Sequence, residues 1–201
     1  MSRADQVWLG ADPGGKGSFG LAILTPDGSA KTWCVDCADA AITIVRANLS
    51  TPPQGAGVDA PLWFSSGPSG DRKSDQWLRK TYKLSGGQVQ AANSLRGAAL
   101  TQGMMFVQRI RELFPSIPVT ETHPNAVLKA LRLEGPSFVQ RFRVTFDETS
   151  KHGLDAVISA VAAREGFCGR WKRDLAESRH PSEQNPNQFW LAPIHYYWPE
   201  A

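Results

Sequence analysis

Four carboxylates stand where short apolar segments of the chain end or where an apolar helix begins: Asp12, Asp59, Glu121 and Asp155. In a mostly parallel sheet, the residues just beyond the carboxyl ends of the strands gather at one edge. Carboxylates brought together there repel one another unless a cation lies between them. Oxygen ligands favour Mg²⁺ or Mn²⁺, and two such ions can support an in-line phosphoryl displacement. The residue types therefore predict a metal centre that acts on phosphate esters.

Asp12 and His152 each allow more than one interpretation. Asp12 precedes a Pro-Gly pair, and an aspartate in that position is also a common turn former. His152 lies three residues before Asp155, so the two share one face of the expected helix. His152 is thus a candidate catalytic residue that could bind a metal, assist proton transfer or only cap the helix.

A basic segment with interleaved aromatic residues is a candidate surface for nucleic acid. Its candidate substrate-binding residues are Arg72, Trp77, Arg79, Lys80 and Lys83. Basic side chains neutralise phosphates, and aromatic rings stack on exposed bases. The alternative is an amphipathic helix that buries Trp77, Leu78 and Tyr82, and the two interpretations are compatible. Lys16, in the turn after the first strand, and His123 are further candidates for substrate binding.

The apolar pattern predicts the elements that would position these residues. Strands are expected at residues 7–12, 19–24, 31–35, 56–60 and 119–121. Helices are expected at residues 38–49, 94–114 with Ser94 as N-cap, after Pro124 through Leu131, and at 152–166. Short turns join the first three strands, which predicts an antiparallel meander.

The chain has 201 residues, enough for one domain with an appendage. We expect a domain over residues 1–167, in which the polar, glycine-rich residues 64–93 form a basic insertion or lid. Residues 168–201 are expected to be an extension that packs on this domain. Residues 64–150 hold twelve basic and seven acidic side chains, an excess that is compatible with a polyanionic partner.

Composition places the chain among ordinary globular proteins, with 41% hydrophobic and 20% charged residues. No apolar run approaches the ~18 residues of a membrane span, and the first residues lack the layout of a secretion signal. Three cysteines are too few for a disulfide framework and suit a reducing compartment. A cytoplasmic protein that does not act at a membrane is therefore expected.

Several short motifs resemble, in order and spacing, those of known nucleases. Residues 10–24, GADPGGKGSFGLAIL, resemble the first hairpin of the ribonuclease H-like (RNase H-like) superfamily, and closely the Gly-x-Asp-Pro-Gly opening of RuvC-type Holliday junction resolvases. Residues 152–157, HGLDAV, resemble the closing aspartate helix of that superfamily. The motifs Val58-Asp-Ala-Pro, Arg72-x-x-Asp-x-x-x-Arg and Glu121-Thr-His-Pro resemble the domain-of-unknown-function family 429, whose members are predicted nucleases. The similarity spans residues 7–166.

The resemblance implies an α/β, RNase H-like fold with a central mixed five-stranded sheet and flanking helices. It implies metal-dependent hydrolysis of phosphodiester bonds in DNA or RNA, with two Mg²⁺ or Mn²⁺ ions. The implied metal ligands and catalytic residues are Asp12, Asp59, Glu121 and Asp155. His123 and His152 are additions to an otherwise all-carboxylate site. A resolvase activity would in addition require a homodimer, because two strands are cut.

Two other classes of function stay open. A non-catalytic binding or scaffold protein could keep the fold and hold a partner through the basic segment and the aromatic C-terminal tail. A single-lobe remnant of an actin-like protein could bind a nucleotide through the first hairpin. The near match of residues 10–17 to a P-loop fails, because Gly17 replaces the hydroxyl residue and a strand follows instead of a helix.

Overall fold

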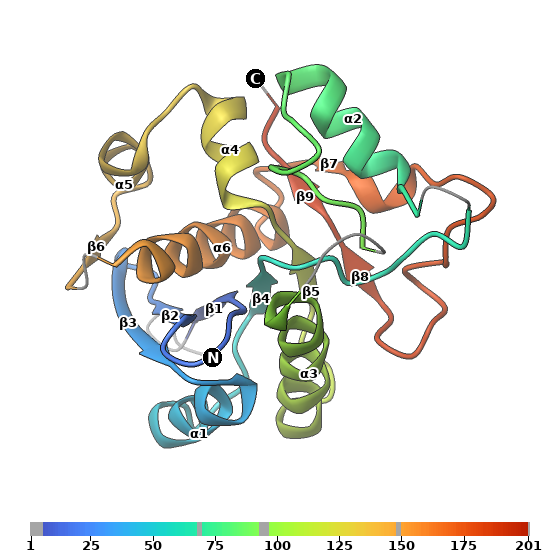
Figure 1. The fold of residues 1–201 in the computed structure, drawn as a ribbon. Helices are drawn as coiled ribbons and strands as arrows, with labels where there is room; N and C mark the ends of the chain where they lie inside the picture. Colours follow the sequence, from blue (N-terminus) through green and yellow to red (C-terminus); the bar gives the residue numbers. More distant parts are fainter. Residues whose placement is uncertain (1–5, 68–69, 93–96, 148–149, 201) are drawn as a thin grey trace.

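In the computed structural model (Figure 1), the chain begins with the predicted antiparallel meander. Its strands are β1 (Trp8–Asp12), β2 (Phe19–Leu24) and β3 (Ser29–Val35), with β2 paired to both neighbours. The apolar run of β2 is buried on both faces, as expected for a central strand. The structure describes residues 6–67, 70–92, 97–147 and 150–200.

Two further strands extend the sheet in parallel on the other side of β1. The strand β4 (Gly55–Val58) pairs with β1, and β5 (Val119–Glu121) pairs with β4. The parallel pairing puts the carboxyl ends of β1, β4 and β5 at the same edge of the sheet. That is the arrangement on which the predicted metal centre depends.

The sheet has seven strands, so the expectation of five strands is wrong. Its order is β6-β3-β2-β1-β4-β5-β8, and four of its six neighbouring pairs are parallel. The additional strands are β6 (Thr145–Phe146) and β8 (Ile194–His195), one at each edge. Segments of two residues have no readable alternation of polar and apolar side chains, and only their neighbours in space make them strands.

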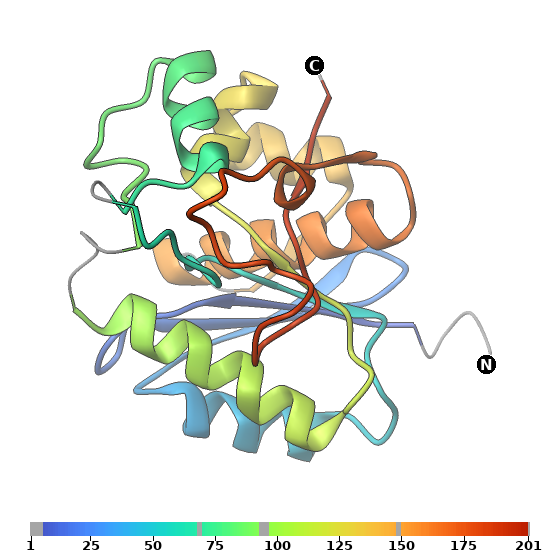
Figure 2. The same ribbon diagram turned by 90° about the vertical axis from the view of Figure 1, so that its right-hand side faces the viewer.

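Helices cover both faces of the sheet (Figures 1 and 2). On one face lie α1 (Ala38–Asn48) and α3 (Ala98–Leu113), and on the other lies α6 (Lys151–Phe167). Three shorter helices lie on the α6 side: α2 (Lys73–Tyr82), α4 (Pro124–Leu131) and α5 (Gly135–Phe142). The protein is thus an α/β structure in which α6 is enclosed by the sheet and outer elements.

Glycines bring α6 into direct contact with the backbone of the sheet. A Cβ atom at Gly10 of β1 would lie 1.8 Å from the carbonyl oxygen of Ala156, and one at Gly57 of β4 would lie 2.0 Å from that of Ser159. Gly20 of β2 makes the same kind of contact with His152. No residue with a side chain fits at these places, so the glycines set how closely α6 approaches the strands.

Residues 64–93 and the helix expected at 94–114 differ in part from expectation. The segment 64–93 contains the helix α2, whose Leu78 is buried as the amphipathic interpretation predicts. The helix α3 begins at Ala98 with Gly97 as its N-cap residue. The expected cap Ser94 lies outside the described residues.

The C-terminal residues pack into the domain rather than beside it. The strand β8 joins the main sheet. The strands β7 (Arg173–Asp174) and β9 (Tyr197–Trp198) pair in a small second sheet, and a 3₁₀ turn at Leu175–Glu177 follows β7. Tyr196 and Trp198 are fully buried, and the indole N–H of Trp198 donates to the hydroxyl of Tyr82 at 2.8 Å. Within the described part of the chain, no helix has the length and apolar character needed to cross a membrane.

Candidate metal centre

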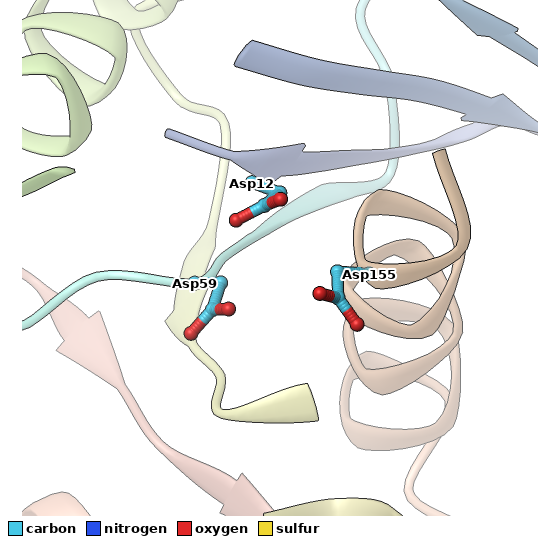
Figure 3. Close-up of side chains that lie close together, drawn as sticks. All are labelled: Asp12, Asp59 and Asp155. Atoms are coloured by element: carbon cyan, nitrogen blue, oxygen red, sulfur yellow. The ribbon is translucent and has the colours of Figure 1, made fainter. Parts of the chain in front are cut away.

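Three of the four predicted carboxylates meet at the carboxyl edge of the sheet (Figure 3). Asp12 ends β1, Asp59 directly follows β4, and Asp155 lies in the second turn of α6. The amide of Asp59 donates to the carbonyl of Ala11 at 2.9 Å, which continues the pairing of the two strands up to the aspartates. Each residue offers a carboxylate oxygen, and these atoms lie within 4.8 Å of one another.

The pleat of the strands explains why these side chains converge. Side chains two residues apart point to the same face of a strand. Asp12 follows Gly10 by two residues, Asp59 follows Gly57 by two, and both glycines face α6. Asp155 is the neighbour of Ala156, whose carbonyl contacts Gly10. The close helix–sheet contact therefore brings the carboxylate of α6 to those of the strands.

The surroundings make all three carboxyls weaker acids than usual. Burial raises the pKa of Asp12, and the adjacent His152 opposes that rise. Burial raises the pKa of Asp59 well above its usual value, and the charges of Asp12 and Asp155 add to the effect. Burial and the charge of Asp12 raise the pKa of Asp155 to about 6. The three pKa values stay raised although basic side chains of α6 oppose the rise, so the donor set fits a divalent cation.

Two basic side chains of α6 border the cluster. Nδ1 of His152 lies 2.6 Å from Oδ2 of Asp12, within hydrogen-bond distance. Nζ of the exposed Lys151 lies 3.9 Å from Oδ2 of Asp155. The sequence interpretation missed Lys151, although its spacing of four residues from Asp155 on an expected helix is a usable signal.

Glu121, expected to be a metal ligand, is held in a buried ion pair with Arg72 and lies outside the group of three aspartates. Oε1 accepts from Nη2 of Arg72 at 2.6 Å, and Oε2 accepts from Nη1 at 2.7 Å. Oε2 also accepts from the backbone N–H of Leu62 at 2.9 Å. Burial raises the pKa of Glu121 to about 6 although Arg72 opposes the rise. Glu121 thus fixes the chain segment that follows Asp59.

Arg72, expected to bind substrate, is only 1% exposed. Nε and Nη2 donate to the carboxylate of Asp75 at 2.8 and 2.7 Å, in addition to the bonds with Glu121. Nη1 also donates to the carbonyl of Trp63, whose ring lies 4.2 Å from the guanidinium carbon. The whole guanidinium group is therefore used in hydrogen bonds inside the protein. An arginine before a helix gives no sign of this burial in the sequence.

The other residues expected to bind substrate divide into packed and exposed side chains. Trp77 has the guanidinium of Arg173 3.9 Å from its ring centroid, and the rings of Tyr82 and Trp198 pack against it edge-on, so stacking of a base on Trp77 is not supported. Arg79 pairs with Asp71 at 2.7 Å. The exposed residues of this set are Lys16, Lys80 and Lys83.

A cleft of about 220 Å³ opens beside the aspartates. Asp12 and Asp59 line it together with His123, Gln88 and Gln90. Nδ1 of His123 lies 3.6 Å from Oδ1 of Asp59, and burial lowers the pKa of this histidine. The two glutamines were not expected from the sequence, because a polar loop without periodicity does not show which of its side chains face a site.

Comparisons with protein-family models, with curated proteins and with solved structures gave no match to this chain.

Proposed function

We propose that this protein is a metal-dependent nuclease of the RNase H-like type that hydrolyses phosphodiester bonds of DNA or RNA. The observation that carries the proposal is the group of three aspartates from β1, the end of β4 and α6, with carboxylate oxygens within 4.8 Å of one another. Two of them line a cleft, where a substrate can reach them. The resemblance of the sequence motifs to those of nucleases suggests this reaction, and the three aspartates provide carboxylates that can bind the metal ions it requires.

The arrangement of the sheet supports the proposed fold type. Its five longest strands follow the order β3-β2-β1-β4-β5, with β2 antiparallel to its neighbours and helices on both faces. This order within the seven-stranded sheet supports the proposal, and β6 and β8 extend the sheet at its two edges beyond the five strands that the resemblance implies. Arg72, Asp75 and Glu121, which belong to the motifs that resemble family 429, form one buried ion-pair network.

In the proposed reaction Asp12, Asp59 and Asp155 would hold two Mg²⁺ or Mn²⁺ ions. The chemistry supplied there is activation of the attacking water and stabilisation of the leaving oxygen. His152 orients the carboxylate of Asp12 through their hydrogen bond, and Glu121 holds the segment after Asp59 through the N–H of Leu62. Exposed Lys16, Lys80 and Lys83 provide charges that attract phosphates.

Cleavage of labelled DNA and RNA oligonucleotides in Mg²⁺ or Mn²⁺ tests this proposal. The variants are Asp12→Asn, Asp155→Asn and their combination, with Glu177→Gln, an exposed carboxylate, as the matched control. Loss of ligands that stabilise transition-state charge predicts a fall in rate of at least about 100-fold for each single variant. The control is expected to keep the wild-type rate.

Calorimetric titration of Mn²⁺ into the same proteins gives an independent readout. Binding that is lost in Asp12→Asn supports the metal centre. Cleavage that survives the double substitution would overturn the assignment of the aspartates. Nucleic-acid binding without cleavage under any metal condition would favour the non-catalytic scaffold, and binding of ATP alone would favour the nucleotide-binding alternative.

A further inference from the structure

The loop that follows α2 forms part of the wall of the cleft beside the aspartates. Gly87, Gln88, Val89 and Gln90 line the cleft together with Asp12 and Asp59. This loop lies within the insertion at residues 64–93, so the insertion contributes directly to the candidate site.

The loop is held in place by buried residues and hydrogen bonds. Nη1 of Arg79 donates to the carbonyl of Val89 at 2.9 Å, while Nη2 of the same side chain pairs with Asp71 at 2.7 Å. The N–H of Ser85 donates to the side chain of Gln88 at 2.9 Å. Leu84 and Val89 are buried in the core. Arg79 therefore acts as a brace between α2 and the wall of the cleft.

The size of the cleft limits what can enter it. Its volume of about 220 Å³ lies below the ~300–1,000 Å³ typical of pockets for drug-sized ligands. A space of this size suits a single base or one nucleotide unit better than a continuous duplex.

The chemistry of the lining suits an unpaired base. Gln88 and Gln90 carry amides: Oε1 of Gln88 accepts from Ser85 and Nε2 of Gln90 donates to the carbonyl of Gly87 at 3.5 Å, so the N–H groups of Gln88 and the Oε1 atom of Gln90 are the groups they offer to the edge of a base. Nδ1 of His123 is buried and has no hydrogen-bond partner within the described part of the chain. Pro13, Pro61 and Ala99 add apolar surface that can pack on the face of a base. In a duplex those edges and faces are already used, and an enzyme must extrude the base to reach them.

We propose that the loop at residues 84–92 makes this cleft a pocket for one unpaired nucleotide, so that the enzyme acts on single-stranded or frayed nucleic acid in preference to continuous duplex. This inference rests on the proposed nuclease function and names its substrate class. The base occupies the pocket while its phosphodiester lies at the aspartates.

The test compares cleavage of one labelled oligodeoxynucleotide of mixed sequence, alone and annealed to its complement. For the wild-type protein we expect the single strand to be cut at least about tenfold faster, because only its bases can make the polar contacts of the pocket. In Arg79→Ala the brace to Val89 is lost, and this preference is expected to fall. Gln76→Ala, an exposed position on the same helix, is the matched control and keeps the preference. Circular dichroism establishes that both variants are folded.

Fluorescence anisotropy with Asp155→Asn gives a readout that does not depend on cleavage. The single strand is expected to bind more tightly than the duplex, and Gln88→Ala combined with Gln90→Ala is expected to reduce that difference.

Equal or faster cleavage of the duplex by the wild-type protein would overturn the inference while leaving the nuclease proposal intact. A folded Arg79→Ala protein with unchanged preference would overturn the role of the loop. Absence of cleavage of either substrate would count against the proposed function, and the anisotropy would still decide between strand types.

Discussion

At the scale of single residues, the three aspartates carry a cost in stability. Each has a pKa raised in the folded protein, so the folded state binds protons more tightly than the unfolded state does. Such groups stabilise the fold at low pH, below their unfolded pKa, and that contribution is lost as pH rises through the folded pKa. The metal-free protein is therefore strained electrostatically at neutral pH by the residues that would bind an ion.

Asp155→Asn is expected to stabilise the metal-free protein at pH 8. The pKa of Asp155 rises from 3.8 to about 6, which corresponds to about 3 kcal/mol in the free energy of unfolding. The gain should decline as pH falls through about 6 and vanish below about 4, where the wild-type carboxyl is protonated in both states. Urea unfolding across this pH range in a chelator measures it. A variant less stable than wild type at pH 8 would contradict a destabilisation of the charged carboxylate by burial and by the charge of Asp12.

The positions of Asp12 and Asp59 could be predicted from the sequence because the ends of apolar strands mark the edge of a sheet, and that of Asp155 because it lies early in an apolar helix. The roles of Glu121 and Arg72 could not. Their ion pair joins residues 49 positions apart, and the sequence shows two charged residues without showing that they meet. In the sequence, a carboxylate at the end of a strand looks the same whether it faces a metal ion or an arginine side chain.

At the scale of elements, the helix–sheet contact explains most of the site. Strands with a clear apolar run and the helices α1, α4 and α6 agree with expectation, since their periodicity reflects the face that they bury. The helix α2 is harder to predict from the sequence because its polar residues outnumber its apolar ones. Arg72 and Asp75 are buried although they are charged, so the apolar pattern does not mark the buried face of this helix. The edge strands β6 and β8 depend wholly on tertiary pairing.

Gly10→Ala is expected to destabilise the fold and weaken ion binding together. The added methyl group would lie 1.8 Å from the carbonyl oxygen of Ala156, so α6 must move away from β1. Overpacking of this kind costs ~1–3 kcal/mol, and rigid backbone on both sides places the loss at the upper end, about 3 kcal/mol. Thermal unfolding and Mn²⁺ titration measure the two effects.

Gly86→Ala is the matched control for this substitution, because no atom lies within 4 Å of the position of its added Cβ. It should leave both stability and Mn²⁺ affinity close to those of the wild type. Equal behaviour of the two alanine variants would show that the close contact at Gly10 does not control the site.

At the scale of the whole molecule, the C-terminal residues connect parts that are distant in sequence. The strand β8 pairs with β5, whose last residue is Glu121, and Trp198 contacts Tyr82 at the end of α2. Arg111 of α3 also donates to the carbonyls of Leu191, Ala192 and Pro193. The last residues of the chain thus support the elements that carry the ion-pair network and the wall of the cleft.

Trp198→Ala is expected to cost ~3–5 kcal/mol of stability, as for other buried aromatic side chains. Trp198 is fully buried, whereas Trp190 in the same C-terminal region is 63% exposed. Trp190→Ala is therefore the matched control and should change the stability by less than about 0.5 kcal/mol. Guanidinium unfolding of both variants measures the difference, and similar losses would argue against integration of the C-terminal strand into the core.

The contact of α6 with the glycines of the strands also has a consequence for how the preference of the candidate metal centre for one ion over another could be changed. Where two backbones touch, the radii of peptide atoms set their closest approach, so as long as the contact glycines are kept, exchange of other core side chains does not bring them closer. Repacking elsewhere in the core would thus leave the span between Asp155 and the strand aspartates unchanged. Selection for a larger or smaller ion should therefore act on the ligands themselves, by exchange of aspartate for glutamate, and not on the packing that surrounds them.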